Sequence, residues 1–476
     1  MKVLFVAAEM MPLVKVGGLA DVAGALPRAL RRLGLDVRVA LPKYAAIDHD
    51  RIAPEQTIAL PSGATVRLVD VGGLPVYLVE HEPSFARPEI YGYDDDPARF
   101  LAFSDQLLAA AEELDWRPDV LHLHDWHPGF IATRLAGNRS HAWASLPLVA
   151  TVHNLAFTGP FDEAFAWEHA FPREALAAPP DVDAAATQSA LGQALLHADL
   201  LTTVSPTYAR EVLEPELGWS LAPLLRRRRD RLSGILNGID MDEYDPAADG
   251  LLAARFDSET LERRSDNRRE LQRFAGLPSV DDVVVLGMVS RLFWQKGPDL
   301  AAAAVERLLA TKRRIQFVVL GQGDEEHERL LQELAARHPR QVAVRFEFAP
   351  ELAALIYGGG DLFLMPSHYE PCGLGQFIAM RYGAVPVVRR TGGLADTVEP
   401  FDRERDGGTG FVFEDASADA LAAALEQALD LYGDRAAWRR LQRRGMAKDW
   451  SWDRSAAQYA ELYQRAIELR AAAVEA

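Results

Sequence analysis

Short apolar runs alternate with helix-length amphipathic segments along the whole chain, and this alternation leaves few folds open. A short continuous apolar run is typical of a strand buried on both faces. Strands of this kind, each followed by a helix, form parallel sheets covered by helices on both sides. We therefore predict an α/β protein made of two Rossmann-like, doubly wound domains. The first series of runs lies at residues 3–7, 37–41, 76–79, 120–123, 148–152, 200–204 and 232–236, and the second at residues 283–289, 315–320, 342–346, 362–365, 385–388 and 410–413.

A segment rich in turn-forming residues separates the two series. Residues 237–250 hold Asn, Asp, Gly and Pro and few core residues, as expected of a linker. The 476-residue length suits two or three domains of about 150 residues. We place the N-terminal domain at residues 1–245 and the C-terminal domain at residues 246–455. Residues 456–476 carry apolar side chains at helical spacing, so we expect a last helix that packs back on the N-terminal domain.

Charge and composition exclude several classes of partner. The net charge of −18 repels polyanions, so nucleic acid and anionic membranes are not expected as main partners. The only basic run, residues 226–231, is predicted to be a solvated helix face. The single cysteine rules out a disulfide within the chain and any multi-cysteine metal site. No apolar stretch approaches the roughly 18 residues of a membrane span, so we expect a cytoplasmic protein, with its oligomeric state unknown.

A glycine pair follows the first predicted strand. Lys15 precedes Gly17 and Gly18, which open a helix in the segment KVGGLAD that ends at Asp21. Bare backbone amides at a helix start, together with an ammonium group, suit an anion. The pattern is neither the dinucleotide fingerprint nor the phosphate loop of nucleotide hydrolases, so NAD binding and ATP hydrolysis lose their usual support. A plain tight turn is the alternative to an anion site. The segment GGLAD recurs at residues 392–396, once in each domain.

Two cations follow the first strand of the second series. Arg291 and Lys296 stand five residues apart, just beyond the predicted strand at residues 283–289. An arginine fork and a lysine point charge can neutralise a diphosphate leaving group without a metal. The alternative is a surface pair at a helix start.

We expect catalytic residues in a strand-to-helix turn at residues 370–375. Glu370, Cys372 and Gly373 follow the apolar run at 362–365 and precede a predicted helix. Ligands of parallel α/β sheets bind at such turns. Cys372 is a possible nucleophile, but a cysteine between Pro371 and Gly373 is more often a packing group. Glu370 is the better candidate, since a carboxylate can offset positive charge developing at a sugar carbon.

Histidines cluster after two strands of the first series. His122, His124 and His127 lie in the segment HLHDWH, and a buried strand usually satisfies its histidines internally. We favour core or substrate-contact histidines over a metal site. His153 and Asn154, at the end of the next strand, could contact a sugar hydroxyl.

Taken together, these motifs resemble those of bacterial glycogen synthases of the starch-synthase type. That family consists of retaining glucosyltransferases of the GT-B architecture, with two Rossmann-like domains and a cleft between them. The resemblance covers nearly the whole chain. It rests on the segments KVGGLAD at 15–21, HDWH at 124–127, TVHN at 151–154, TVSPTYA at 203–209, LNGID at 236–240, SR at 290–291, QKG at 295–297, EPCGL at 370–374 and RRTGGLAD at 389–396.

The resemblance implies ADP-glucose as donor, the non-reducing end of an α-1,4-glucan such as glycogen as acceptor, and neither metal nor other cofactor. It implies Glu370, His153, Lys296 and Arg291 as catalytic residues. Retention requires either front-face attack or a covalent intermediate, and both stay open. The implied donor-binding residues are Lys15, Gly17, Gly18, Asp21, Arg291, Lys296, Phe348, Cys372, Gly373, Leu374, Thr391 and Gly392. The implied acceptor or sugar contacts are His124, Asp125, His153, Asn154 and Asn237.

Some positions depart from the family pattern. Ile378 stands where related nucleotide-sugar transferases carry a second glutamate, which favours the glucan-synthase branch. Residues 348–350, FAP, replace a Tyr-Asp-Glu type sequence near the nucleotide base, a cation is missing before residue 202, and residues 218–221 replace a glycine-rich loop. The choice between ADP-glucose and UDP-glucose therefore stays open.

Four other functions are alternatives to a glucosyltransferase. A nucleotide-sugar epimerase or hydrolase could use the same architecture and cations. A glycogen phosphorylase would need a pyridoxal phosphate lysine and is usually much longer. A glucan-binding scaffold would need no turnover at all.

Overall fold

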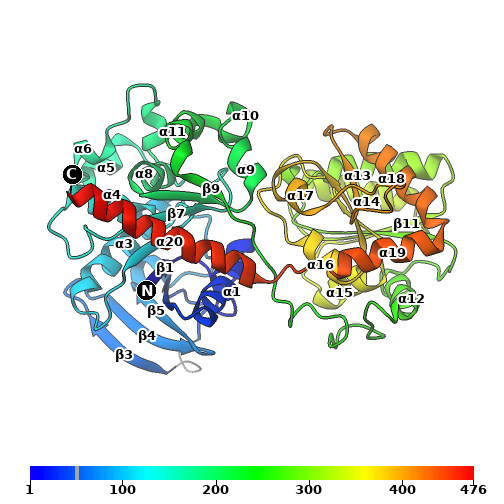
Figure 1. Ribbon diagram of the computed structural model, residues 1–476, viewed down its shortest axis with the longest axis horizontal. Coiled ribbons are helices and arrows are strands. Elements are labelled where there is room, and N and C mark those ends of the chain that lie inside the picture. The colour runs from blue at the N-terminus through cyan, green and yellow to red at the C-terminus, as the bar shows by residue number, and fades with distance from the viewer. Residues whose placement is uncertain (49–52, 476) are drawn as a thin grey trace. The chain divides into compact units, whose positions relative to one another are not determined.

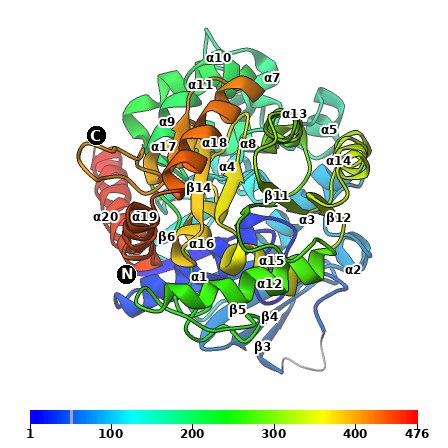
Figure 2. The same ribbon diagram turned by 90° about the vertical axis from the view of Figure 1, so that its right-hand side faces the viewer.

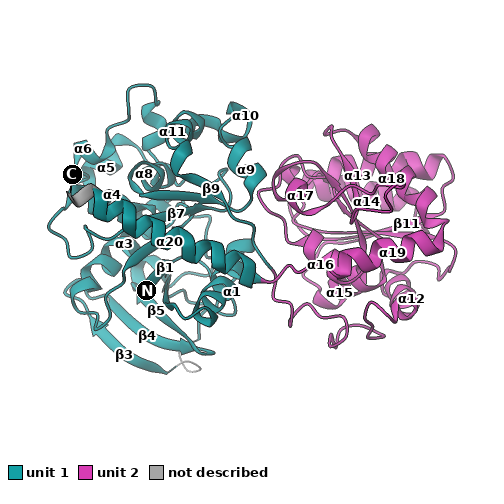
Figure 3. Cartoon of the chain, viewed as in Figure 1, with its two compact units in different colours: residues 1–238, 452–476 teal, residues 239–451 magenta. Residues whose placement is uncertain are grey.

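The computed structural model describes residues 1–48 and 53–475. Contacts divide the chain into two compact units, coloured separately in Figure 3. Unit 1 comprises residues 1–238 and 452–476, and unit 2 comprises residues 239–451. The chain therefore passes between the units twice, and its last helix belongs to the first unit.

Within the described residues, unit 1 is built on a nine-stranded sheet in the order β3-β4-β5-β2-β1-β6-β7-β8-β9. From β5 to β9 all neighbours are parallel, as predicted from the apolar runs. From β2 through β1 to β6 the strand order reverses, which is the topological switch point of a doubly wound sheet. The strands are β1 (Lys2–Val6), β2 (Asp36–Pro42), β3 (Pro54–Ala59), β4 (Thr65–Val71), β5 (Leu74–Glu80), β6 (Val120–His124), β7 (Leu148–Val152), β8 (Leu200–Thr203) and β9 (Leu232–Gly234).

The antiparallel strands β3 and β4 were not predicted. They extend the sheet beyond β5, with β3 paired to β4 and β4 paired to β5. Their residues are mostly exposed or half-buried, so they lack the continuous apolar run that marks a strand covered on both faces.

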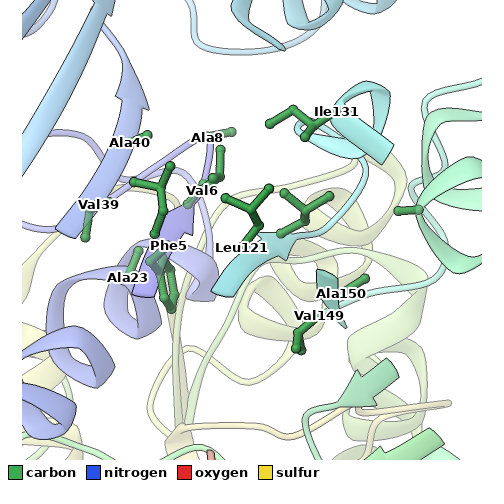
Figure 4. Close-up of a cluster of buried hydrophobic side chains, with 14 of the residues drawn as sticks. Phe5, Val6, Ala8, Ala23, Val39, Ala40, Leu121, Ile131, Val149 and Ala150 are labelled. Atoms are coloured by element: carbon green, nitrogen blue, oxygen red, sulfur yellow. The ribbon is translucent and has the colours of Figure 1, made fainter. Parts of the chain in front are cut away.

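Helices cover the sheet of unit 1 (Figure 1). The core between them is apolar, and Figure 4 shows part of it, where Phe5 and Val6 of β1 lie near Leu121 of β6 and Ala23 of the first helix. The helices are α1 (Gly18–Arg32), α2 (Glu82–Phe85), α3 (Asp96–Ala109), η2 (Ala110–Glu112), α4 (Gly129–Gly137), α5 (Glu163–Glu168), α6 (Arg173–Leu176), α7 (Ala184–Thr187), α8 (Ala190–His197), α9 (Pro206–Glu211), α10 (Pro215–Gly218), η3 (Trp219–Leu221), α11 (Ala222–Arg227), η4 (Arg229–Arg231) and α20 (Trp452–Glu475).

Helix α20 packs on unit 1 along its apolar stripe. Tyr459, Tyr463 and Ala466 are fully buried there, and α20 lies against α1. Near its start, Asp453 pairs with Arg32 of α1 at 2.6 Å. The Tyr463 hydroxyl lies 2.8 Å from Nδ1 of His122 on β6. The helix begins at Trp452 rather than at residue 456.

Unit 2, all of whose residues the structure describes, has a six-stranded parallel sheet in the order β12-β11-β10-β13-β14-β15. Numbered within the unit this is the Rossmann order 3-2-1-4-5-6, with its switch point between β10 and β13. The prediction of two Rossmann-like domains is thereby confirmed. The strands are β10 (Val284–Val289), β11 (Ile315–Leu320), β12 (Val342–Arg345), β13 (Leu362–Met365), β14 (Val385–Arg389) and β15 (Phe411–Phe413).

Helices flank both faces of this sheet, and α12 and α15 pack against each other, as Figure 2 shows. The helices are η5 (Leu261–Arg263), α12 (Arg264–Ala275), η6 (Trp294–Lys296), α13 (Pro298–Ala310), α14 (Glu325–Arg337), α15 (Pro350–Gly359), α16 (Gly375–Arg381), α17 (Gly392–Thr397), α18 (Ala418–Tyr432) and α19 (Arg435–Met446). Among the described residues, none of the helices is both long and apolar enough to span a membrane.

The boundary between the units differs from the predicted one at residue 245. The turn-rich segment after Gly238 is fastened to unit 2, because Ile239 N–H donates to Trp450 O at 2.8 Å. The Arg381 guanidinium also binds the Tyr244 carbonyl and the Asp245 carboxylate, each at 3.0 Å. Turn-forming residues thus mark a loop held on one unit, and the chain crosses at 238/239 and 451/452.

The basic run at residues 226–231 is not a continuous solvated helix face. It spans the end of α11 and the short η4, and Arg228 is half-buried. The Arg228 guanidinium donates to the carbonyls of Leu195, Leu196 and Ala198, at the end of α8. One arginine of the run therefore caps a helix, as a cation near a helix C-terminus can do.

Candidate functional site

The candidate site of unit 2 lies at the carboxyl ends of β10 and β13, the two strands at the switch point. Lys296 ends η6, which follows β10, and Glu370 follows β13. Lys296 Nζ lies 2.8 Å from Glu370 Oε1 and 2.6 Å from Glu370 Oε2. Ser367 Oγ donates to the same Oε2 at 3.0 Å. The carboxylate is therefore held by a cation and a hydroxyl where α/β sheets bind ligands.

This pair is sheltered from solvent. Glu370 is 3% exposed, and the Lys296 side chain is 19% exposed. A buried carboxylate is costly unless it is paired and hydrogen-bonded, and here it is both. Removing either partner would leave the other charge without compensation.

The turn after Glu370 depends on glycines. Gly373 has φ +75° and Gly392 has φ +42°, conformations that side-chain-bearing residues rarely adopt. A Cβ on Gly392 would overlap the Glu370 carbonyl oxygen, and one on Gly393 would overlap the Cys372 backbone. Gly393 N–H donates to Glu370 O at 3.1 Å. The second GGLAD segment therefore brings the start of α17 against the Glu370 turn.

Cys372 is 4% exposed. Its carbonyl accepts a hydrogen bond from Gln376 Nε2 at 3.0 Å, which ties the turn to α16. Glu370 is buried to the same degree, at 3% exposure, so burial alone does not separate the packing interpretation from the nucleophile, and the preference for packing still rests on the sequence.

The other predicted residues of unit 2 line the same edge of the sheet. Arg291 is exposed just after β10, and its guanidinium lies 5.4 Å from the centre of the Phe293 ring. Phe348 follows β12 and is 90% exposed. Thr391 is buried before α17, and Leu374 immediately precedes α16. The structure thus orders the edge from Phe348 at β12, through the β10 cations, to Glu370 at β13.

In unit 1, the glycine loop after β1 differs from the prediction of bare amides. Glu9 Oε2 accepts hydrogen bonds from Val16 N at 2.6 Å and Gly17 N at 2.8 Å. Lys15 Nζ pairs with Asp21 Oδ1 at 2.6 Å. Two of the predicted anion donors, the Lys15 ammonium and the Gly17 amide, are therefore already bound to the Asp21 and Glu9 carboxylates. Helix α1 begins directly after them at Gly18.

Glu9 is a residue that motif reasoning missed. It is 4% exposed, and the Tyr91 hydroxyl donates to its Oε1 at 3.2 Å. An acidic residue just beyond the first apolar run was the available signal. No local signal pointed to Tyr91, which lies 82 residues away in the chain.

The ends of β6 and β7 bring four predicted polar residues together. Asp125, with φ +59°, accepts from His153 N at 2.6 Å and more weakly from Asn154 N at 3.4 Å. His124 Nδ1 and His153 Nε2 share a hydrogen bond of 2.9 Å. His124 Nε2 is buried and has no hydrogen-bond partner within the described part of the chain.

Burial shifts the titration of this cluster. It raises the pKa of Asp125 to about 7, and nearby Glu9 acts in the same direction while the backbone N–H donors oppose it. Burial lowers the pKa of His153 to about 3 and that of His127 to about 3. At neutral pH both imidazoles are uncharged, and Asp125 is present both as acid and as carboxylate.

His122 does not join this cluster as a ligand. Its ring nitrogens lie 2.8 Å from the Tyr463 hydroxyl and 2.7 Å from Thr151 Oγ1, so both are used internally. Asn237 is buried at the end of unit 1, and its Oδ1 has no hydrogen-bond partner among the described residues. In the described ranges no three His, Cys, Asp or Glu side chains gather as metal ligands would.

A pocket of about 830 Å³ lies elsewhere in unit 1. Lys2, Asp119 and Pro147 line it, at or just before the amino ends of β1, β6 and β7, and Arg470 of α20 lines it as well. This is the opposite edge of the sheet from the cluster of Asp125 and His153. The pocket is therefore separate from the candidate site.

Comparisons with known proteins cover both units. The model of the starch synthase catalytic domain matches residues 2–227, and the model of glycosyl transferases group 1 matches residues 269–444. A glycogen synthase of Moorella thermoacetica is 41% identical, over 100% of this chain and 98% of the relative. One from Syntrophotalea carbinolica is 43% identical, over 98% and 99%.

Solved structures agree with these relatives. The catalytic domain of starch synthase IV from Arabidopsis thaliana, bound to ADP and acarbose, is 34% identical, with a TM-score of 0.88 over 98% of this chain and 99% of that one. A sucrose-phosphate synthase from Thermosynechococcus elongatus, 19% identical with a TM-score of 0.61 over 98% of each chain, shares the fold.

Proposed function

We propose that this chain, which belongs to the glycogen synthase family, transfers glucosyl units from ADP-glucose to the non-reducing ends of an α-1,4-glucan with retention of configuration. The observation that carries the proposal is the Lys296 and Glu370 pair at the switch point of unit 2. A cation and a carboxylate there suit a sugar carbon that gains positive charge while a diphosphate leaves. The similar starch synthase IV, which was solved with ADP and acarbose, supports the choice of donor and acceptor.

We assign stabilisation of the leaving diphosphate to Lys296 and Arg291. Negative charge grows on the diphosphate as the bond to the sugar breaks, so cations placed there favour the transition state more than the bound substrate. Lys296 supplies a point charge, and the exposed guanidinium of Arg291 can donate two N–H groups to one phosphate. Because these two side chains supply the positive charge, we propose that the reaction needs no metal ion.

Glu370 is assigned to the sugar carbon. Ser367 and Lys296 fix its carboxylate, and Gly393 fixes its backbone carbonyl. The carboxylate is thus preorganised to offset the positive charge of an oxocarbenium-like transition state. Retention by front-face attack and retention through a covalent intermediate both use this support, and neither uses the buried Cys372.

Unit 1 is assigned contacts to sugar hydroxyl groups. Asp125, with its pKa of about 7, can donate as an acid or accept as a carboxylate at neutral pH. His153 is neutral there, and its backbone N–H is held by Asp125. A neutral imidazole and a well-fixed carboxyl group suit the hydroxyl groups of a neutral sugar.

The test is a transfer assay with labelled ADP-glucose and glycogen, run in parallel with UDP-glucose. We expect label to enter the polymer, faster from ADP-glucose than from UDP-glucose. An α-1,4-specific amylase should release this label again. Free glucose or an isomerised nucleotide sugar without labelled polymer would instead indicate a hydrolase or an epimerase. Glycogen binding without turnover of either donor would indicate a scaffold. A Glu370→Gln variant is the matched control for contaminating activity.

A further inference from the structure

An exposed tryptophan stands beside the candidate catalytic pair. Trp294 begins η6, two residues before Lys296, and is 56% exposed. Its ring stacks on the His368 ring with centroids 4.2 Å apart and planes inclined by 8°. His368 lies two residues before Glu370. One face of the indole is therefore backed by the Glu370 loop, while much of the side chain remains open to solvent.

Several contacts keep this stack rigid. His368 N–H donates to Gln295 O at 2.8 Å, and the Arg389 guanidinium donates to His368 O at 2.6 Å. His368 Nε2 lies 3.3 Å from an Asp299 carboxylate oxygen at the start of α13. A large apolar ring that is held in place and still exposed loses little conformational entropy when it binds a ligand. These contacts do not explain why the outer part of the ring is left uncovered.

The position of Trp294 along the sheet edge favours a sugar over a nucleotide base. The aromatic side chain expected near the base, Phe348, follows β12, and β11 separates β12 from β10, the strand that precedes Trp294. On its other side β10 adjoins β13, the strand that precedes Glu370. Trp294 thus belongs to the end of the edge where the glucosyl group reacts.

The exposed fraction of the side chains increases from Glu370 outward to Trp294. Exposure rises from 3% for Glu370, through 19% for the Lys296 side chain, to 56% for Trp294. The donor glucose must reach the buried carboxylate, whereas a polymer must extend outward from it. A fixed aromatic face at the outer end of this gradient matches the apolar C–H face of a glucose ring.

We infer that Trp294, backed by His368, is a stacking platform for a glucosyl unit of the α-glucan acceptor. This inference rests on the proposed function. The interaction is a contact only, with no covalent step. It assigns to Trp294 acceptor affinity rather than donor binding or chemistry.

The experiment compares Trp294→Ala and Trp294→Phe with the parent protein in steady-state assays that vary glycogen and ADP-glucose separately. We expect Trp294→Ala to raise the KM for glycogen about tenfold, the size of one good aromatic contact, with a smaller effect on the KM for ADP-glucose. Trp294→Phe should recover most of the glycogen affinity. Phe274→Ala, at an exposed aromatic side chain of α12, is the matched control and should behave like the parent.

A binding measurement without donor keeps the test independent of turnover. In native gels containing glycogen, Trp294→Ala should be retarded less than the parent and Trp294→Phe. An unchanged glycogen KM and unchanged retardation would overturn the inference, as would a rise confined to the KM for ADP-glucose. An equal fall of kcat in both Trp294 variants without a change in glycogen KM would also overturn it, by showing that the stack only braces the loops. Failure of the parent to make polymer would instead reject the proposed function.

Discussion

The ammonium nitrogen of Lys296 lies 2.6 and 2.8 Å from the two carboxylate oxygens of Glu370, across 74 residues of sequence. The two side chains come from the loops after β10 and β13, neighbouring strands at the switch point of unit 2. This pair joins the cation proposed for the leaving diphosphate to the carboxylate proposed for the sugar carbon.

Replacing Lys296 by alanine is expected to lower kcat/KM by roughly 10² to 10³-fold, which corresponds to about 2.7 to 4 kcal/mol of transition-state stabilisation. The loss combines the missing cation with a buried carboxylate left without its partner. Steady-state kinetics with ADP-glucose and glycogen measure it. Lys448→Ala removes a lysine from a surface ion pair with Glu399 and serves as control. A change of less than about threefold for Lys296→Ala would remove Lys296 from the proposed chemistry.

Cys372→Ser and Glu370→Gln separate the two interpretations of the turn. We expect Cys372→Ser to keep kcat within about threefold while lowering the free energy of unfolding by about 1 to 3 kcal/mol, because a buried hydroxyl replaces a thiol. Glu370→Gln should lose at least about 10²-fold in kcat. Kinetics and chemical denaturation measure both. Inactivity of a folded Cys372→Ser protein would restore the nucleophile hypothesis.

Asp125 is expected to give a pH-dependent stability. Its folded-state pKa of about 7 exceeds its ordinary value of 3.8, so between these values the folded protein holds a proton that the unfolded chain lacks. Its contribution to stability is therefore full at acid pH and is lost as pH rises through about 7. Asp125→Asn cannot titrate, so its stability relative to the parent should improve across this window, by at most about 1.4 kcal/mol per pH unit. Denaturant unfolding at several pH values tests this, and parallel curves for the two proteins would contradict it.

The two GGLAD segments offer a matched pair of glycine substitutions. Gly393→Ala would drive its Cβ into the Cys372 backbone, whereas a Cβ at Gly18 would meet no described atom within 4 Å. We expect Gly393→Ala to cost roughly 1 to 3 kcal/mol of stability and Gly18→Ala less than about 1 kcal/mol. Thermal unfolding compares them directly. Equal losses would show that the close approach of α17 to the Glu370 turn is not needed.

Removal of divalent metal ions is expected to leave glucosyl transfer within about twofold of its starting rate, since Lys296 and Arg291 are proposed to neutralise the diphosphate. The assay compares enzyme dialysed against EDTA with enzyme supplied with magnesium. A loss of more than tenfold that magnesium restores would show that the two cations do not suffice.

Much of the fold followed from local patterns. The apolar runs marked every strand of the parallel part of each sheet, and the ordered motifs led to a family that the comparisons confirm. Runs such as residues 284–289 are readable because a strand buried on both faces needs apolar residues throughout. The half-exposed strands β3 and β4 carry no such signal and were missed.

The residues of the candidate site could be predicted from the sequence, but the contacts between them could not. Lys296 and Glu370 were each singled out, yet their ion pair was not predicted, and the roles assigned to them remain predictions. For the glycine loop the sequence left an anion site and a plain tight turn open, and it did not predict that Glu9 accepts hydrogen bonds from the Val16 and Gly17 amides. The partners Tyr91 and Ser367 and the stacked ring of His368 were not anticipated.

The sequence by itself determined the two α/β units, the family and the segments that carry the functional side chains, because strand burial and turn chemistry are written in neighbouring residues. Only the tertiary structure decided that Glu370 meets Lys296, that Glu9 fills the first glycine loop, that Trp294 lies flat on His368, and that the chain crosses between units at 238/239. These contacts join residues far apart in the chain. They depend on strand order and on which loops meet at one sheet edge, and no local periodicity specifies that order.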